Sequence, residues 1–302
     1  MPVKRRIMRA EPVFRDYIWG GTRLKTEYGK VTDLSPVAES WELSDCPVLI
    51  KLIDARDVLS VQVHPDDEYA RLHETMTGKT EMWVILDCEA DSFVYYGFNR
   101  EIERAEVRRR IENGTLTEVL YNLPVKRGDV IFIPAGTIHA IGKGILLAEV
   151  QQHSDLTYRV YDYNRLGADG KPRPLHIEKA LDVLDTGPAS HTAPGARMLD
   201  DKPGCRLECL AETQYFITDR LTLSGLYGQS AGAGLSVLCV EGSCSLECDG
   251  EALNVTKGEC VYISAGLDDI LFAGDGVFLL VAIPQTHEAG YIAGGTPALP
   301  EV

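Results

Sequence analysis

The amino-acid sequence predicts a mainly β protein built from two related antiparallel barrels. Short segments rich in β-branched and aromatic residues recur along the chain, and Gly, Pro or Asp separates them. Long helical patterns are few, which favours a sandwich or barrel architecture. A strand-turn-strand pattern of the first half also returns in the second half. The expected strands include VLSVQVHP, EMWVIL, DVIFIPAG, ILLAEVQQ, LSVLCVEG, GECVYISAG and GVFLLVAIP.

Two segments depart from the strand pattern, and each predicts a helix. Residues 100–112 carry mixed charges and end at Asn113-Gly114, a typical stop signal for a helix. Residues 176–184 predict a second, shorter helix. We therefore expect a small helical insertion at about residues 100–122 in the first half of the chain.

A segment without apolar periodicity separates the two halves of the chain. Residues 186–204 are rich in Gly, Pro and Ala, a composition typical of a linker. We expect a first domain at residues 1–185, which includes the N-terminal segment and carries the chemistry. A second domain is expected at residues 205–302.

Composition and charge disfavour several classes of partner. The chain has 302 residues, of which 45% are hydrophobic and 25% charged, and its formal net charge is −15. The negative charge disfavours nucleic acids and anionic membranes, but a few local Lys and Arg residues can still bind a small anion. No apolar run reaches the roughly 18 residues of a membrane span, and the N-terminus lacks an apolar signal core. We expect a cytoplasmic protein.

The cysteines do not form a pattern typical of disulfides or of a zinc ribbon. Six of the eight lie between Cys205 and Cys260, and none forms a C-x-x-C pair. Cys205/Cys209 and Cys244/Cys248 share a C-x-x-x-C spacing, which places both sulfurs of a pair on one face of a strand. A structural zinc is the alternative, but reduced thiols buried as small hydrophobic groups are favoured.

The internal repeat predicts which barrel keeps a functional site. The first copy reads Gly128-DVIFI-Pro134-A-Gly136-TI-His139, and the second copy is GECVYISAGLDD at residues 258–269. Both follow the pattern G-x5-[PS]-x-G-x2-[HD]. The second copy has lost the Pro and the His, so we expect only the first barrel to keep a site.

Four residues of the first half are candidate metal ligands. Gln62 and His64 stand two apart on an expected strand, so their side chains point to the same face. Glu81 opens the next strand, and His139 follows the Pro134-Ala-Gly turn. Two His and one Glu form a recurrent catalytic zinc site, and the same set also suits non-haem Fe(II). Ligand type alone does not separate these metals.

The His139 motif resembles the second motif of the cupin superfamily. The usual final Asn of that motif is absent, because the run continues Ala140-Ile141-Gly142-Lys143. The first cupin motif normally carries H-x-H, whereas this chain has Gln62-Val63-His64. The resemblance implies two cupin (jelly-roll) barrels, the second degenerate, while the departures disfavour a general cupin oxygenase.

The chain also resembles the type I mannose-6-phosphate isomerases in their short bacterial form. The matching stretches are RDYIWGG, ESWELS, IKLIDARDVLSVQVHPDDEYA, GKTEMWVI, GDVIFIPAGTIHAI and QQHSDLTYRVYDYNR. They lie almost continuously in the first half of the chain, whereas the C-terminal third matches only weakly. QVHPDDEYA followed by GKTEMW is the most specific pairing.

This resemblance implies one bound Zn²⁺ per chain, with other divalent metals possible, and it assigns roles to particular residues. The metal positions of the family fall on His64, Glu81 and His139. Gln62 is a ligand in the longer relatives and is less certain in this chain. The catalytic arginine falls on Arg159, since Ser154-Asp155-LTY-Arg159 matches the S-D-x-x-x-R pattern of the family. The active-site lysine, two residues before the metal-binding Glu, falls on Lys79.

The implied reaction is the aldose–ketose interconversion of mannose 6-phosphate and fructose 6-phosphate through a metal-stabilised ene-diolate. Asp155 and Lys79 are both candidates for the general base. Lys79 would need a lowered pKa, which a nearby metal cation would supply. Asp155 could instead hold Arg159 in place or cap a turn. Arg159 is suited to gripping either a phosphate or the ene-diolate oxygens.

Lys51 and Lys126 are candidate substrate-binding residues, since both are basic and lie close to matched motifs. A purely structural role is the alternative for each. The remaining histidines lack a partner at strand spacing and are expected not to bind metal: His73, His153, His176, His191 and His287.

Two other kinds of function remain as alternatives. The first is another metal-dependent cupin enzyme, either an Fe or Mn oxygenase or an isomerase of non-phosphorylated sugars. The second is a non-catalytic sugar-binding cupin. The expected partner is a small sugar phosphate, with no nucleic acid and no membrane, and the sequence leaves the oligomeric state open.

Overall fold

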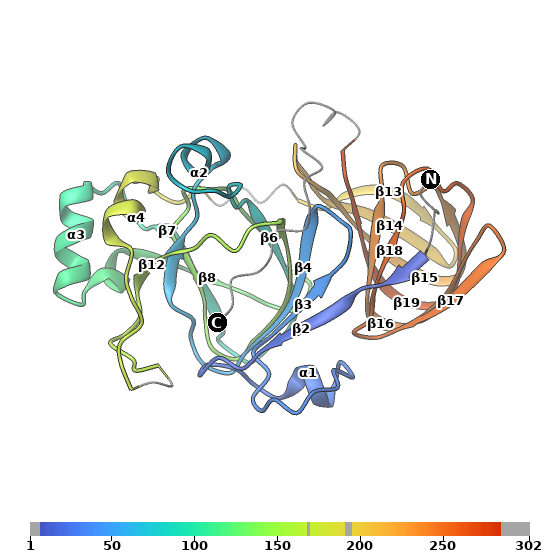
Figure 1. Ribbon diagram of the computed structural model, residues 1–302, viewed down its shortest axis with the longest axis horizontal. Helices are drawn as coiled ribbons and strands as arrows, with labels where there is room; N and C mark the ends of the chain where they lie inside the picture. The colour runs from blue at the N-terminus through green and yellow to red at the C-terminus, as the bar shows by residue number, and fades with distance from the viewer. Residues whose placement is uncertain (1–6, 168–169, 191–194, 285–302) are drawn as a thin grey trace.

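The computed structural model describes residues 7–167, 170–190 and 195–284, and antiparallel strands dominate it (Figure 1). The strands form three sheets in which every pair of neighbouring strands is antiparallel. The prediction of a mainly β protein is therefore confirmed. Part of the predicted linker and the last residues of the predicted second domain lie outside the described residues.

Two of the three sheets enclose the first barrel. The six-stranded sheet has the order β2 (Glu11–Arg15), β3 (Glu39–Leu43), β4 (Val48–Ala55), β11 (Ile145–Gln152), β6 (Glu81–Cys88) and β9 (Val130–Ile133). The five-stranded sheet has the order β12 (Tyr158–Tyr161), β5 (Val61–Val63), β10 (His139–Ile141), β7 (Phe93–Phe98) and β8 (Leu120–Pro124).

The eight-stranded sheet forms the other end of the molecule (Figure 1). Its order is β1 (Ile7–Arg9), β18 (Cys260–Ile263), β16 (Leu235–Cys248), β19 (Ile270–Ala282), β15 (Ile217–Gln229), β14 (Cys205–Glu212) and β13 (Arg197–Lys202), and β17 (Glu251–Thr256) pairs with β16. The N-terminal strand β1 thus joins a sheet built otherwise from the C-terminal part of the chain. The domain division at residues 186–204 stays a prediction.

The six-stranded sheet is buried on both faces, and this explains its continuous apolar runs. On one face, Leu52, Val84 and Ala148 share a core with residues of the eight-stranded sheet such as Leu238 and Leu279. The opposite face is lined by alternate residues of the same strands, including Ile53, Ile85 and Leu147, and looks into the first barrel. All eight residues of β4 and of β11 are buried as a result.

The outer face of the five-stranded sheet packs against the helices. Val61 and Val63 of β5 lie in a core with Val107 and Ile111 of α3 and with Leu181 of α4. Figure 1 shows these two helices at the end of the molecule opposite the eight-stranded sheet. The alternate residues of β5 therefore face the barrel interior, as the period-2 pattern predicts.

The two predicted helices are confirmed, with small shifts of their ends. The helices are α1 (Arg23–Thr26), α2 (Asp67–His73), α3 (Arg104–Glu112) and α4 (Ile177–Val183), and η1 (Leu116–Val119) is a 3₁₀ helix. The sequence analysis did not predict α2, although Asp66 caps it by accepting a hydrogen bond from the backbone N–H of Tyr69. None of the helices in the described part of the chain is long and apolar enough to cross a membrane.

The internal repeat has the same backbone in both copies. Gly128 and Gly258 precede β9 and β18 with φ angles of 90° and 87°. Gly136 and Gly266 follow these strands with φ angles of 86° and 69°. These left-handed conformations favour glycine, so the repeated glycines preserve one turn geometry in both barrels.

Candidate metal centre

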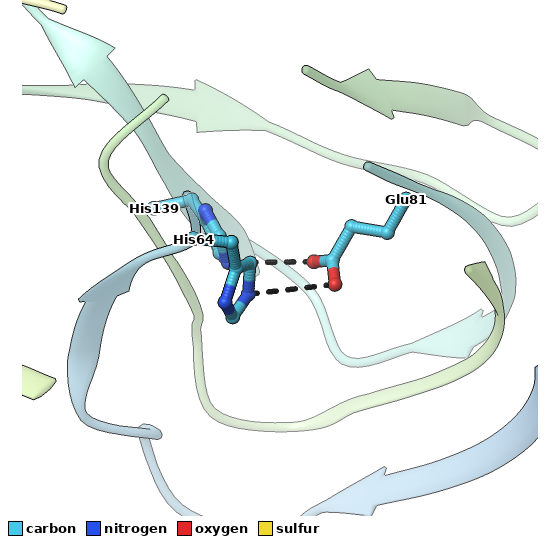
Figure 2. Close-up of side chains that lie close together, drawn as sticks. All are labelled: His64, Glu81 and His139. Carbon is cyan, nitrogen blue, oxygen red and sulfur yellow. Dashed lines mark ion pairs between the residues drawn. The ribbon is translucent and has the colours of Figure 1, made fainter. Parts of the chain in front are cut away.

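Three strands bring the predicted ligands together inside the first barrel. His64 follows β5, Glu81 is the first residue of β6, and His139 is the first residue of β10. Because β10 pairs with β5 so that His139 lies opposite Gln62, these two side chains share one face of the sheet. Glu81 approaches from the facing sheet. Figure 2 shows the two imidazoles on one side and the carboxylate on the other.

The three side chains form a compact and fully enclosed group. Their ligand atoms all lie within 4.8 Å of one another, and each residue is at most 1% exposed. The Nε2 atom of His139 is 3.3 Å from Oε1 of Glu81, and the Nε2 atom of His64 is 3.5 Å from Oε2. The imidazole centroids are 4.9 Å apart. The structure thus confirms the predicted convergence of these residues.

Backbone contacts leave both imidazoles ready to bind a cation. Nδ1 of His64 donates to the carbonyl of Leu156 at 2.9 Å, and Nδ1 of His139 donates to the carbonyl of Thr137 at 2.9 Å. A carbonyl can only accept, so each neutral ring has its proton on Nδ1 and a lone pair on Nε2. Metal-binding histidines commonly have this arrangement. Each Nε2 lies within 3.5 Å of a Glu81 carboxylate oxygen.

The charge states of the group also fit a divalent cation. Burial lowers the pKa of His64 well below its usual value and that of His139 to about 4, so both rings are neutral near pH 7. Both carboxylate oxygens of Glu81 are buried; Oε2 forms an ion pair with Lys79 at 2.6 Å, whereas Oε1 lacks a hydrogen-bond partner among the described residues. A buried carboxylate oxygen without a partner is costly unless a further cation compensates it. The donor set of two imidazoles and one carboxylate suits zinc and similar metals.

Gln62 lies beside this group and offers a fourth side chain. Its amide nitrogen is 3.3 Å from Nε2 of His139. Rotation of the terminal amide by half a turn exchanges its nitrogen and oxygen, so the same position can present an oxygen. The structure therefore places Gln62 beside the three side chains, and its role as a metal ligand stays a prediction.

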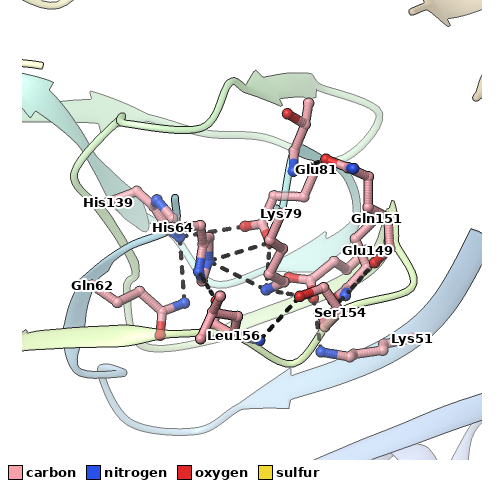
Figure 3. Close-up of polar contacts among 12 residues, drawn as sticks. Lys51, Gln62, His64, Lys79, Glu81, His139, Glu149, Gln151, Ser154 and Leu156 are labelled. Atoms are coloured by element: carbon pink, nitrogen blue, oxygen red, sulfur yellow. Dashed lines mark hydrogen bonds and ion pairs between the residues drawn. The ribbon is translucent and has the colours of Figure 1, made fainter. Parts of the chain in front are cut away.

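A buried network of charges adjoins the three candidate ligands (Figure 3). Nζ of Lys79 is 2.6 Å from Oε2 of Glu81, 3.2 Å from Nε2 of His64 and 3.6 Å from Oε1 of Glu149. Lys51 reaches the same oxygen of Glu149 at 3.2 Å. Two ammonium groups thus face two carboxylates in a region that is at most 5% exposed.

These pairs fix the charge on Lys79. Burial opposes that charge, but the carboxylates of Glu149 and Glu81 outweigh burial and raise the pKa of Lys79. Protein groups alone therefore keep Lys79 as an ammonium and do not supply the lowered pKa that a general base needs. Burial, together with Glu149, raises the pKa of Glu81.

The loop between β5 and β6 holds two ligand-bearing segments together. The N–H of Lys79 donates to the carbonyl of Pro65 at 3.0 Å, which closes the loop at its base. Oδ1 of Asp67 accepts from the N–H of Gly78 at 2.8 Å and from the side chain of Gln152 at 3.0 Å. These contacts fix His64 and Glu81 next to each other although 16 residues separate them in the sequence.

Arg159 and Asp155 lie near this centre, in different settings. Arg159 is on β12 directly opposite Gln62, so Arg159, Gln62 and His139 form one row across three strands. Its Nη1 donates to the carbonyl of Pro174 at 3.0 Å. Asp155 lies in the loop between β11 and β12, is partly buried, and is not one of the three converging ligands.

The two predicted substrate-binding lysines have different positions. Lys51 is buried on β4, paired with Glu149 and placed 4.2 Å from the ring centre of Trp41. Lys126 lies before β9, at the end of that strand away from its pairing with Glu81. Its side chain is 83% exposed and pairs with Asp129 at 2.6 Å. The structure brings Lys51 to the centre and does not bring Lys126 there.

The sequence analysis missed Glu149, which contacts both buried lysines and accepts a hydrogen bond from the indole of Trp83 at 2.9 Å. A signal was present, because ILLAEVQQ contains a charged residue within an otherwise apolar strand. Glu149 and Gln151 are two apart and so share the face of β11 that looks into the barrel. A charge on such a buried face requires partners.

The other candidate metal positions are not supported by the described residues. All eight cysteines are free thiols, and none belongs to a group of three or more potential ligands in the described ranges. His73, His153 and His176 also lie outside the cluster. His191 and His287 fall outside the described residues.

Comparisons with known proteins assign the chain to a family. No protein-family model matches the chain. The mannose-6-phosphate isomerase ManA of Bacillus subtilis is 38% identical over 254 residues, which cover 71% of this chain and 79% of that protein. The mannose-6-phosphate isomerase of Streptococcus mutans is 33% identical over 310 residues, covering 88% of this chain and 96% of that protein.

Structural comparison agrees with the sequence comparison. The crystal structure of the mannose 6-phosphate isomerase from Bacillus subtilis superimposes with a TM-score of 0.86 and 28% identity, covering 92% of this chain and 99% of that one. The predicted cupin fold is thereby confirmed. The chain belongs to the family of mannose-6-phosphate isomerases.

Proposed function

We propose that this protein is an aldose–ketose isomerase that interconverts mannose 6-phosphate and fructose 6-phosphate. One observation carries the proposal: two imidazole Nε2 atoms and the buried carboxylate of Glu81 converge within 4.8 Å inside the barrel. Two relatives that match 71% and 88% of the chain are named as mannose-6-phosphate isomerases.

The residues fit a resident divalent cation, and we propose Zn²⁺. His64, Glu81 and His139 would hold it, with Gln62 as a further ligand. Three protein ligands with an open position are typical of catalytic zinc sites. When bound, such a cation polarises a substrate carbonyl and stabilises the negative charge that develops on its oxygen.

Lys79 is the residue best placed to act on the sugar oxygens beside the ligands. As a buried ammonium it can donate hydrogen bonds to the oxygens on C1 and C2 of the sugar. The reaction moves a proton between these two carbon atoms. Glu149 and Lys51 hold this ammonium in place. Asp155 remains a candidate for the base, because the next residue, Leu156, orients His64.

Arg159 would bind the substrate from the strand at the other end of this row, two strands away from His139. Its row with Gln62 and His139 directs it to the barrel interior, and its Nε atom is buried without a hydrogen-bond partner among the described residues. A planar guanidinium with a free donor is suited to phosphate or to ene-diolate oxygens.

A direct assay tests this proposal. The purified protein is incubated with mannose 6-phosphate, and fructose 6-phosphate is measured by a coupled enzymatic assay in the presence and absence of oxygen. We expect equilibration of the two sugar phosphates that does not depend on oxygen. Oxygen consumption would indicate a cupin oxygenase, and turnover of mannose but not of its phosphate would indicate an isomerase of free sugars.

A further inference from the structure

The loop between β12 and α4 gathers arginine side chains around one buried carboxylate. Asp162, which is 5% exposed, accepts three hydrogen bonds of 2.7 Å: one from Arg165 and two from Arg173. Arg165 also donates to the carbonyl of Val58 at 2.5 Å. A single carboxylate thus fixes two guanidinium groups that are only 18% and 21% exposed.

Arg159 stands at the base of the same loop. Its backbone exchanges hydrogen bonds with His176, since the Arg159 N–H donates to Nδ1 of His176 and the His176 N–H donates to the Arg159 carbonyl. Arg159, Arg165 and Arg173 are called the arginine cluster below. Burial lowers the pKa of Arg159, and the like charge of Arg173 is the next largest cause. The Arg159 guanidinium donates to the carbonyl of Pro174, the residue after Arg173, so the two arginines are near neighbours.

The arginine cluster has free hydrogen-bond donors and uncompensated charge. The Nε atoms of Arg159 and Arg165 are buried and have no hydrogen-bond partner among the described residues. Three guanidinium groups and the Asp162 carboxylate together carry two excess positive charges. A phosphate monoester carries about −1.5 to −2 charges at pH 7 and offers three strong acceptor oxygens. The charge and the donors of the cluster therefore match a phosphate monoester.

The position of the cluster matches the length of the substrate. His139, Gln62 and Arg159 lie on successive strands, and neighbouring strands are about 4.8 Å apart. The backbones of His139 and Arg159 are therefore separated by about two such spacings. A hexose phosphate bound with its carbonyl end at the metal ligands would extend its phosphate end towards the cluster.

We propose that the arginine cluster binds the phosphate group of the substrate and that Asp162 is the positioning residue of this subsite. The inference rests on the proposed function, since it assigns the phosphate end of the same substrate. Arg173 contributes a guanidinium from the β12–α4 loop, held by a two-pronged contact with Asp162. Fork-shaped contacts of this kind fix orientation as well as charge.

The variant Arg173→Gln tests the subsite. We expect the KM for mannose 6-phosphate to rise about tenfold to a hundredfold, as for the loss of a charged hydrogen bond, with kcat and metal content little changed. The dissociation constant of inorganic phosphate, measured by calorimetric titration of the metal-loaded protein without turnover, should rise in parallel. Arg197→Gln is the matched control, because Arg197 is exposed on β13 and pairs with Glu212.

The variant Asp162→Asn separates positioning from simple electrostatics. It removes the negative charge of the carboxylate and so raises the net charge of the cluster by one. Electrostatics alone would therefore tighten phosphate binding. If Asp162 orients the arginines, the same change weakens phosphate binding and raises KM. Tighter binding in Asp162→Asn would therefore refute the positioning role. Folding is checked by circular dichroism, and Arg173→Gln remains informative if Asp162→Asn does not fold.

The titration also distinguishes failure of this inference from failure of the proposed function. Wild-type protein that binds inorganic phosphate but does not isomerise mannose 6-phosphate would overturn the function and leave the anion subsite standing. Arg173→Gln protein that isomerises the sugar phosphate and binds inorganic phosphate as the wild type does would overturn the subsite alone.

Discussion

The ammonium nitrogen of Lys79 lies 2.6 Å from Oε2 of Glu81, the carboxylate on which both imidazoles converge. This pair is buried, and Glu149 on the neighbouring strand shares the same ammonium. The protein therefore compensates the carboxylate of this candidate ligand with a positive charge of its own. Lys79 therefore stabilises the buried carboxylates of Glu81 and Glu149 and also lies beside the proposed metal ligands.

Lys79→Met should destabilise the metal-free protein. The change removes a charge from between two buried carboxylates, and breaking a buried pair typically costs about 3–5 kcal/mol in free energy of unfolding. Denaturant unfolding in the presence of a chelator measures this loss. Lys126→Met is the control: this exposed lysine pairs only with Asp129 in the described structure, so its loss should leave unfolding unchanged. Equal stability of the two variants would contradict the buried network.

His139→Ala should remove metal and activity together. The imidazole supplies one of three ligand atoms, so we expect a larger loss of metal affinity than the about 10–100-fold caused by removing a group that only orients a ligand. Metal content after dialysis, measured by mass spectrometry, tests this. His153→Ala is the control, because that ring lies outside the ligand group and contacts the Cys46 carbonyl at 3.4 Å. Full metal content in His139→Ala would exclude His139 as a ligand.

Chelation should abolish turnover reversibly. Removal of the cation leaves Oε1 of Glu81 without a hydrogen-bond partner among the described residues, so we also expect the melting temperature to fall. Adding back Zn²⁺, Mn²⁺, Co²⁺ or Fe²⁺ separately, with activity and melting temperature recorded for each, identifies the metals that the site accepts. Undiminished isomerisation after complete removal of metal would show that no cation is required.

Arg159→Ala should lose activity and keep its metal. The guanidinium lies two strands from His139 and contacts no ligand, while its free Nε is available to the substrate. We expect kcat/KM to fall by about tenfold to a hundredfold, as for the loss of a charged hydrogen bond to the substrate. Steady-state kinetics and metal analysis on the same sample test this. Loss of metal in this variant would indicate a structural role instead.

Local sequence patterns could predict much of the fold and the centre of the site. The alternation of Val61, Gln62 and Val63 correctly separated the helix-packed face of β5 from its interior face. The repeated strand-turn-strand pattern correctly placed His139 after a glycine turn that follows a strand. Such features are decided by two-residue periodicity and by backbone conformation, which a short segment specifies by itself.

Features that depend on distant pairing could not be predicted in this way. The pairing of β1 with β18 joins segments about 250 residues apart in the chain, and no local pattern encodes that register. The charges of Lys51, Lys79 and Glu149 compensate one another only once β4, β6 and β11 lie side by side. Lys126 is close to a matched motif in the sequence, but its side chain is exposed and lies away from the site. Proximity in sequence did not predict its position in space.

The central claim is that His64, Glu81 and His139 hold one catalytic cation, and an anomalous difference map from crystals grown with Zn²⁺ tests it most directly. The account predicts a peak inside the first barrel, about 2.0–2.2 Å from the two Nε2 atoms and from a Glu81 oxygen. A barrel interior without a peak, with zinc found only at the cysteines of the eight-stranded sheet, would contradict it.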